Sequence, residues 1–146
     1  MKNVMQQVLN YFDDVHNMEV KFSAHASGFT ANVNNSRIVY RSEDVEAISV
    51  VWEETDNFNM FSITVTMGEL EMSDQTRQLV NTYNLASYGW KAIVGNGTPY
   101  LSFTCEYEYV QPDKIYQVLS MAFGELCGAD NEVEFYDLIS KQLKKQ

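Results

Sequence analysis

Alternation of apolar and polar residues in the first half of the chain constrains its fold more than any other sequence feature. In residues 47–67, apolar side chains fall on every second position of two segments that Thr55-Asp56-Asn57 separates. A period of two is typical of a β-strand with one buried face, whereas a helix has a period near 3.6. The two segments therefore predict an antiparallel hairpin. Its buried face is expected to comprise Ile48, Val50, Trp52, Phe61, Ile63, Val65 and Met67.

The preceding segment alternates in the same way. Its expected faces are Val20, Phe22, Ala24 and Ala26 on one side and Lys21, Ser23 and His25 on the other. Ser27-Gly28 can turn the chain, and residues 29–33 resume the alternation. A second turn signal at residues 34–36 precedes the apolar run at residues 38–40. We expect residues 20–41 to add strands, and whether they form a full hairpin within the main sheet stays open at this level.

Four segments have the spacing of amphipathic helices. The first ends near residue 17, and the second begins at Ser73, whose hydroxyl is a good N-cap. The third follows Pro112, which suits a first helical turn, and the fourth starts at Asn131, which with Glu134 resembles a capping box. Their expected apolar faces are Val4, Met5, Val8, Leu9, Phe12 and Val15; Leu79, Val80, Tyr83 and Ala86; Ile115, Val118, Leu119, Ala122, Phe123 and Leu126; and Val133, Tyr136, Ile139 and Leu143.

The pair Asn96-Gly97 is the clearest local turn signal, because a two-residue type I′ hairpin needs residues that accept a positive φ. With these two residues as the loop, Ala92 lies opposite Leu101 and Trp90 opposite Phe103. The second strand then has Cys105, Tyr107 and Tyr109 on its buried face and Glu106 and Glu108 on its solvated face. The two glutamates are therefore interpreted as exposed strand residues, and not as a carboxylate site.

These elements predict an α+β fold, in which an antiparallel meander sheet carries helices on one face. The expected order is helix, strands, helix, β-hairpin and helix, with an extra C-terminal helix. The chain has 146 residues and is 45% hydrophobic, so we expect one α+β domain that spans residues 1–146 around a single core. Whether the last helix packs on its own domain or on a second subunit stays open.

Charge narrows the choice of partners. The formal net charge is −10 at pH 7, so neither nucleic acid nor an anionic membrane surface is an expected partner. The N-terminal segment lacks the apolar stretch of a signal peptide, and no run approaches the roughly 20 apolar residues of a membrane helix. Cys105 and Cys127 form no redox or metal-binding spacing. We therefore expect a cytoplasmic protein with reduced thiols.

Few residues are suited to catalysis. His16 falls at a helix end and His25 on the polar face of a strand. The nearest approach to a metal-ligand cluster, Asp13-Asp14-His16, is interpreted as a solvated helix end, and Gly95-Asn96-Gly97 is too short for a phosphate loop. We expect no enzyme activity, no metal and no cofactor. An enzyme would need a cleft that brings His25 or Cys105 to carboxylates.

Two surface features suggest a protein partner. Residues 43–74 hold nine acidic residues and no Lys or Arg. Such a stretch can keep a sheet edge soluble, or it can attract a basic segment of another protein; both interpretations stay open. Met60, Ile93 and Tyr100 are apolar residues expected on otherwise polar strand faces, so they are the candidate partner-binding residues.

The segment VNTYNLASYGWKAIVGNGTPYLSFTCEYEYVQPDKIYQVLSMAFGEL resembles the YbjN-type bacterial domain, which shares its fold with type III secretion chaperones. The resemblance covers residues 73–127 and rests on the apolar pattern and on the pair Tyr83-Asn84 near the end of the second helix. It implies a small, acidic, cytoplasmic and dimeric protein that binds other polypeptides and has no catalytic site. Residues 20–41 and the helix after Asn131 depart from the family pattern.

Two functions are compatible with these observations. The first is a non-catalytic protein-interaction module, chaperone-like or regulatory, that binds another polypeptide through a partly apolar sheet or helix surface, with a homodimer allowed. The alternative is a small-molecule-binding, ligand-sensing domain with a pocket between helix and sheet. The expected pocket residues are Tyr83, Trp90 and Phe123.

Overall fold

The fold was determined from a computed structural model of the chain. It describes residues 1–16, 19–33, 45–87, 89–95, 97–128, 135 and 137–144. The apolar run at 38–40, the turn at 34–36 and the capping pair Asn131 and Glu134 lie outside the described residues. The side chains of His16 and Cys127 lie outside them as well.

The fold is α+β, as the sequence predicts. Its elements are α1 (Lys2–His16), β1 (Val20–His25), β2 (Gly28–Val33), β3 (Ala47–Thr55), β4 (Phe58–Glu69), α2 (Asp74–Ala86), β5 (Lys91–Val94), β6 (Tyr100–Glu108), a 3-10 turn (Pro112–Lys114) and α3 (Ile115–Gly128). The strands form one antiparallel sheet in the order β1-β2-β3-β4-β6-β5. The first four strands form a meander, and β6 lies between β4 and β5.

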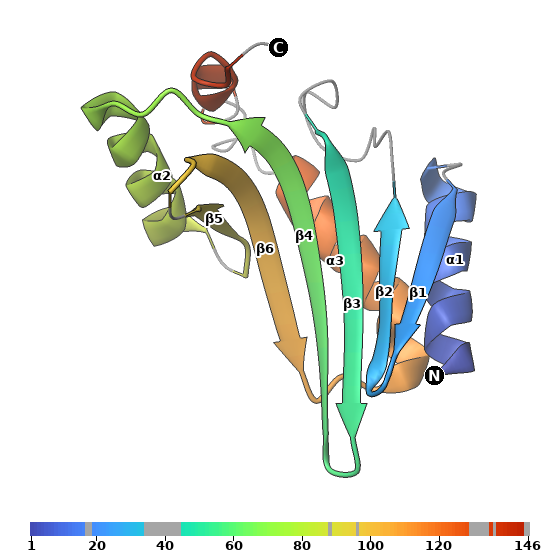
Figure 1. Cartoon of the computed structure of the whole chain (residues 1–146). Coiled ribbons are helices and arrows are strands. Elements are labelled where there is room, and N and C mark those ends of the chain that lie inside the picture. The colour runs from blue at the N-terminus through green and yellow to red at the C-terminus, as the bar shows by residue number, and fades with distance from the viewer. Residues whose placement is uncertain are drawn as a thin grey trace.

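One face of the sheet carries the core. Figure 1 shows α1 and α3 on this face, behind the sheet in the view, and α2 beside β5. The expected alternation is confirmed on the central strands, where every second side chain is buried. The buried side chains of the sheet are Phe29, Ala31, Val33, Ile48, Val50, Trp52, Phe61, Ile63, Val65, Met67, Ala92, Leu101, Phe103 and Cys105. Each large apolar side chain buried in this way contributes about 1.5–3 kcal/mol to folding.

The face that α1 turns to the core differs from the expected one. Val4, Val8, Tyr11 and Phe12 are buried, whereas Leu9 is 37% exposed. Tyr11 was not among the residues expected on the apolar face, but its ring stacks on Phe123 of α3 with the ring centroids 5.9 Å apart. The helix is therefore rotated so that it packs against α3 as well as against the sheet, and this rotation turns Leu9 outward.

The C-terminal segment packs on its own chain. Residues 137–140 are helical, and Phe135 and Ile139 are buried in the core. Leu143 then forms a β-bridge with Leu70 just beyond β4. The Lys144 N–H donates to the Glu69 carbonyl at 2.8 Å, and the Lys144 ammonium lies 3.1 Å from the Glu69 carboxylate. Among the described residues, this segment thus extends the sheet at the end of β4.

The register of the β5–β6 hairpin differs from the prediction by two residues. Ala92 lies opposite Phe103, not Leu101, so the connection is longer than the Asn96-Gly97 turn that we expected. The position of Pro99 explains the difference. A strand between two neighbours needs every backbone N–H, which proline lacks, and β6 accordingly begins only at Tyr100. The two-residue shift leaves the faces unchanged, because the side-chain period is also two.

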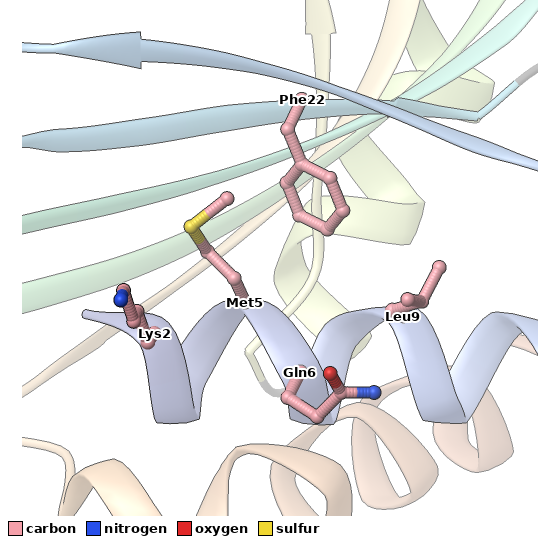
Figure 2. Close-up of a pocket in the computed structure, with 5 residues that line it drawn as sticks. All are labelled: Lys2, Met5, Gln6, Leu9 and Phe22. Carbon is pink, nitrogen blue, oxygen red and sulfur yellow. The ribbon is translucent and has the colours of Figure 1, made fainter.

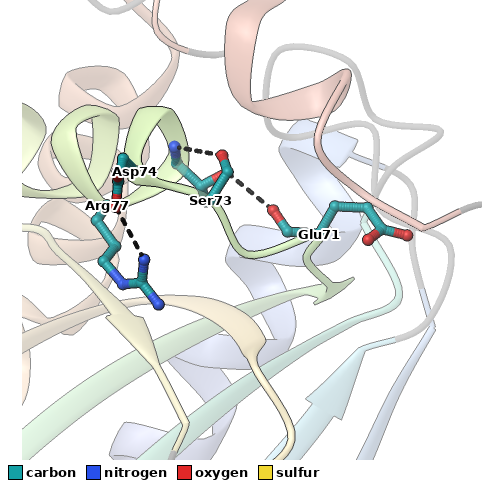
Figure 3. A network of polar contacts seen from close by, with 5 residues as sticks. Glu71, Ser73, Asp74 and Arg77 are labelled. Carbon is teal, nitrogen blue, oxygen red and sulfur yellow. Dashed lines mark hydrogen bonds and ion pairs between the residues drawn. The ribbon is translucent and has the colours of Figure 1, made fainter.

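The beginning of α2 is held by local hydrogen bonds (Figure 3). The Ser73 hydroxyl accepts a hydrogen bond from the Thr76 N–H at 3.2 Å, which confirms the expected N-cap. The Thr76 hydroxyl donates to the Glu71 carbonyl at 2.8 Å, and Arg77 lies 3.3 Å from Asp74 on the first turn. These bonds fix the direction in which α2 leaves the end of β4 and approaches β5.

At its other end, α2 blocks the edge of the sheet at β5. The Gly95 N–H donates to the Tyr100 carbonyl, so the even-numbered residues of β5 direct their backbone groups away from β6. The Asn84 side chain pairs with both groups of Ala92, accepting from its N–H at 2.7 Å and donating to its carbonyl at 2.8 Å. Asn84 therefore takes the place that a further strand would occupy.

Replacing Asn84 with alanine should lower the free energy of unfolding by about 1–3 kcal/mol, because the partly buried N–H and carbonyl of Ala92 lose their partners. Urea denaturation monitored by circular dichroism measures the change. Asn81→Ala, at an exposed position of the same helix, is the matched control and should change stability by less than about 0.5 kcal/mol. Equal effects of the two substitutions would contradict the role given to Asn84.

Candidate functional site

The hairpin between β3 and β4 reaches past the neighbouring strands at one end of the sheet (Figure 1). Two aromatic side chains lie near its turn. Phe58 and Tyr109 contact each other edge to face, with ring centroids 5.3 Å apart. Phe58 is partly exposed and Tyr109 is 70% exposed. Met60 lies two residues beyond Phe58 on the same outer face of β4, opposite the core face. We call this region the hairpin surface and define it by Phe58, Met60, Tyr109, Glu53, Glu106 and Glu108.

The conformation of Tyr109 departs from the sequence prediction. Tyr109 was expected to continue the buried face of β6, but β6 ends at Glu108 and Tyr109 has a φ of +55°. This left-handed conformation is unfavourable for a residue with a bulky side chain. Asn59 stabilises it, since its carbonyl accepts from the Tyr109 N–H at 3.0 Å and its side-chain oxygen accepts from the Val110 N–H at 2.6 Å. The backbone that carries the exposed ring is thus held at two points.

Carboxylates flank the apolar centre of the hairpin surface. Met60 pairs with Glu53 of β3 on one side and with Glu108 of β6 on the other, so the Cα atoms of the two glutamates lie about 10 Å apart, two strand spacings. Glu106 lies opposite Ser62, one pair further along the sheet. Glu106 and Glu108 are exposed, as expected, and neither carboxylate forms an ion pair or hydrogen bond within the described ranges. The surface therefore combines apolar side chains with uncompensated negative charge.

Part of the acidic stretch at residues 43–74 has structural partners. Glu53 lies 3.8 Å from His25 and accepts a hydrogen bond from the Ser27 hydroxyl. Glu54 accepts from the buried indole N–H of Trp52 at 2.9 Å. Glu43 and Asp44 lie outside the described residues. Several acidic side chains thus help to position strands, whereas Glu106 and Glu108 of the hairpin surface have no such partner among the described residues.

The three residues expected to bind a partner do not form one patch. Ile93 is 48% exposed and lies opposite Ser102, close to Tyr100. Met60 instead lies opposite Glu108, eight residues along β6 from Tyr100, or roughly 26 Å of strand. Tyr100 also hydrogen-bonds to the Glu46 carboxylate, which raises the pKa of the Tyr100 hydroxyl. Of the three, only Met60 belongs to the hairpin surface.

The three residues expected to line a pocket are part of the core. Tyr83, Trp90 and Phe123 are buried, with no more than 4% of any side chain exposed. The Trp90 and Phe123 ring centroids lie 5.9 Å apart, and the Trp90 indole donates to the Ala122 carbonyl at 2.7 Å. Their rings therefore fill the space between helix and sheet, and they join α3 to the start of β5.

The residues considered for catalysis lie apart from each other. His25 ends β1 on the outer side of the sheet edge, while Cys105 is buried on the core face of β6. Burial raises the pKa of the Cys105 thiol, which keeps it protonated and unreactive. The structure does not bring these two residues together. In the described ranges, no three His, Cys, Asp or Glu side chains are grouped so that they could hold a metal ion.

Sequence reasoning missed Phe58 and Tyr109. Phe58 follows Asn57 at the turn and lies two residues before Met60. Because residues two apart in a strand share a face, this spacing could have placed Phe58 on the outer face. No sequence signal places Tyr109 on the outer face. Cys105, Tyr107 and Tyr109 alternate as one strand face would, although β6 ends at Glu108. The change of direction depends on Asn59, which is 50 residues away in the sequence.

No protein-family model matches the sequence, and a search of curated proteins also found no match. The resemblance to the YbjN-type domain therefore stays a prediction. None of the helices in the described ranges has both the length and the apolar content that crossing a membrane requires.

Stability should fall as the pH rises above about 9, because Cys105 and Tyr107 resist ionisation in the folded protein. Burial raises the pKa of the Cys105 thiol from its ordinary value of 9.0. Burial, followed by the hydrogen bond with Cys105, raises the pKa of Tyr107 from 10.0. The unfolded chain loses these protons first and so binds fewer protons than the folded chain. The stabilising contribution is therefore complete below pH 9 and lost as the pH rises towards the folded-state values.

Urea denaturation between pH 7 and pH 11 measures this dependence. Tyr107→Phe should make the alkaline decrease in the free energy of unfolding less steep, since the phenol is removed. Tyr109→Phe, at an exposed ring, should leave the slope of the wild-type protein unchanged. The same slope in all three proteins would contradict a role of Tyr107 in the alkaline loss.

Proposed function

We propose that the chain is a non-catalytic polypeptide-binding module that binds a basic segment of another protein on the hairpin surface and works in the cytoplasm. The observation that carries the proposal is the exposed Tyr109 ring, which Asn59 holds in a left-handed conformation beside Phe58. Unfavourable backbone conformations that the surrounding structure maintains are concentrated at functional sites. An exposed aromatic residue in a fixed position also loses little conformational entropy when it binds.

The chemistry of the hairpin surface favours lysine or arginine in the partner. A cation over an exposed aromatic ring contributes about 0.5–1 kcal/mol, and an exposed ion pair about 0.2–1 kcal/mol. Neither is sufficient alone, because association costs at least about 4 kcal/mol. A segment that reaches the two rings, Met60 and the carboxylates together could combine these contributions. The flexible side chain of Met60 can adapt to partners of different shape.

Two further observations support this proposal. The net charge of −10 attracts a basic segment from a distance and accelerates its association. The resemblance to type III secretion chaperones implies the same class of function. A small-molecule function has no comparable support, because the rings of Trp90 and Phe123 pack against each other.

Selection of random 12-residue peptides displayed on phage against the full chain tests the proposal. The selected peptides should be rich in Lys and Arg with at least one apolar residue, and their affinity should decrease with rising salt concentration. Tyr109→Ala and Glu108→Lys should each weaken the binding of a selected peptide by about 10-fold or more, measured by isothermal titration calorimetry.

Glu71→Lys is the matched control. It changes the net charge by the same amount as Glu108→Lys, but at an exposed position beyond the far end of β4. It should weaken binding less than about threefold, since the substituted charge lies more than one Debye length from the hairpin surface. Selection of peptides without basic residues, or equal effects of the two charge changes, would contradict the proposal.

A further inference from the structure

The edge of the sheet at β1 has backbone groups that no described residue pairs, unlike the edge at β5. Within the described residues, β1 pairs with β2 alone. The Glu54 N–H donates to the Ser27 carbonyl, so the odd-numbered residues of the second strand bond to β3 and the even-numbered ones to β1. The pairing partners in β1 are then Lys21, Ser23 and His25. The backbone groups of the even-numbered residues 20, 22 and 24 point out of the sheet.

No hydrogen bond to these outward N–H and carbonyl groups is found within the described part of the chain. Each of the residues Val20, Phe22 and Ala24 therefore offers one donor and one acceptor to an added strand. An edge of this kind promotes pairing with another chain unless it is blocked. The Asn84 side chain blocks the edge at β5, and β1 has no equivalent residue among those described.

An apolar groove runs beside this free edge. Figure 2 shows Phe22 of β1 reaching towards Met5 and Leu9 of α1, with Lys2 and Gln6 on the same flank of the helix. The groove has a volume of about 280 Å³. Phe22 is only partly buried and packs edge to face on Phe29 with centroids 5.5 Å apart, and Leu9 is 37% exposed. The unpaired strand and the apolar flank of α1 thus form one continuous surface.

We propose that a second copy of this chain occupies this surface, so that two β1 strands pair antiparallel across a twofold axis that passes beside Phe22. The outward N–H and carbonyl groups of one β1 strand must bond to those of the other strand. Even-numbered residues of one copy therefore lie opposite even-numbered residues of the other. With Phe22 opposite its counterpart, Val20 lies opposite Ala24 and Lys21 opposite Ser23. The two sheets become continuous, and Leu9 and Met5 of the two α1 helices meet on the core side of the axis.

Charge favours a second copy over other occupants. Lys2 and Lys21 lie at this edge, so it does not favour the basic segment that suits the hairpin surface. In the proposed register, Glu19 of one copy lies opposite His25 of the other, and no two like charges are directly opposed. Of the two registers shifted by one pair of residues, one would place Lys21 opposite Lys21, which is destabilising. The other would place Lys21 opposite His25 and lose the pairing of Glu19 with His25. The same strand is therefore complementary to itself, as an interface with twofold symmetry requires.

Sedimentation equilibrium of the full chain over about 1–200 µM tests the proposal. We expect a concentration-dependent species of twice the 16.8 kDa chain mass. Ala24→Pro removes one outward N–H without breaking a bond to β2, and it should weaken the dimer by about 10-fold or more. Ala26→Pro, in the exposed turn after β1, is the matched control and should leave the dimer unchanged.

Leu9→Glu tests the helical part of the interface without changing the strand. It should also weaken the dimer by about 10-fold or more, whereas Leu85→Glu, at a side chain that is 81% exposed on α2, should not. A monomer at every concentration, or a dimer that neither Ala24→Pro nor Leu9→Glu weakens, would overturn the proposal.

Cross-linking tests the register. In the proposed pairing, the Cα atoms of Lys21 and Ser23 of the two copies lie about 4.5 Å apart, within the range of a disulfide. In a Cys127→Ser background, oxidation of a mixture of Lys21→Cys and Ser23→Cys chains should yield a covalent heterodimer. Lys21→Cys alone should yield little, because its Cα atoms would be about 8 Å apart. Equal cross-linking in the two cases would overturn the register.

The proposed dimer does not depend on the proposed function. The two fail separately, because the hairpin surface lies at a different part of the sheet from the apolar groove. A dimer with the predicted cross-link that selects no basic peptides would contradict only the proposed function. A monomer that binds such peptides through Tyr109 would contradict only the dimer.

Discussion

The burial of a single face of the sheet is the constraint on which the rest of the structure depends. Every second residue of the central strands enters one core, which α1 and α3 close from the same side. The opposite face then carries partly exposed polar side chains such as Thr64 and Thr104 in its centre. Among the described residues, no group of side chains that could hold a metal ion lies in that centre. The exposed aromatic residues of the hairpin surface and the outward backbone groups of β1 lie at the periphery of the sheet.

These peripheral features are built from contacts between distant parts of the chain. Asn84 pairs with Ala92 and blocks one edge, whereas the donors and acceptors of the other edge, beside an apolar groove, have no partner in the described ranges. Asn59 holds Tyr109 outward at the end of β6. In the proposed dimer the two free edges meet, and each copy keeps its hairpin surface open. Two such surfaces on one particle would bind a partner with repeated basic segments more tightly than one alone.

The prediction from sequence succeeded where one local rule decides the outcome. The period of two located the strands of the meander, and the Ser73 hydroxyl caps α2 as expected.

The prediction from sequence failed where two structural elements compete for the same residue. Leu9 has the spacing of a core residue, but Tyr11 packs against α3 and turns the helix. The Asn96-Gly97 signal was outweighed by Pro99, which cannot donate within a central strand. Tyr83, Trp90 and Phe123 were taken for a pocket lining, because aromatic spacing alone does not distinguish a filled space from an empty one.

The sequence by itself determined the α+β class, the strands of the meander, the apolar face of α3 and the excess of negative charge, because each follows from spacing or composition along the chain. Only the tertiary structure decided which strands form the edges, which side of α1 faces outward and where the aromatic residues of the rim point. The neighbour of a strand is chosen by pairing across the whole fold, and the alternation of residues within a strand is the same in the centre and at the edge. Asn84 shows the limit most clearly: its sequence position marks a helix end, and its function in closing the sheet depends on a strand that lies eight residues further along the chain.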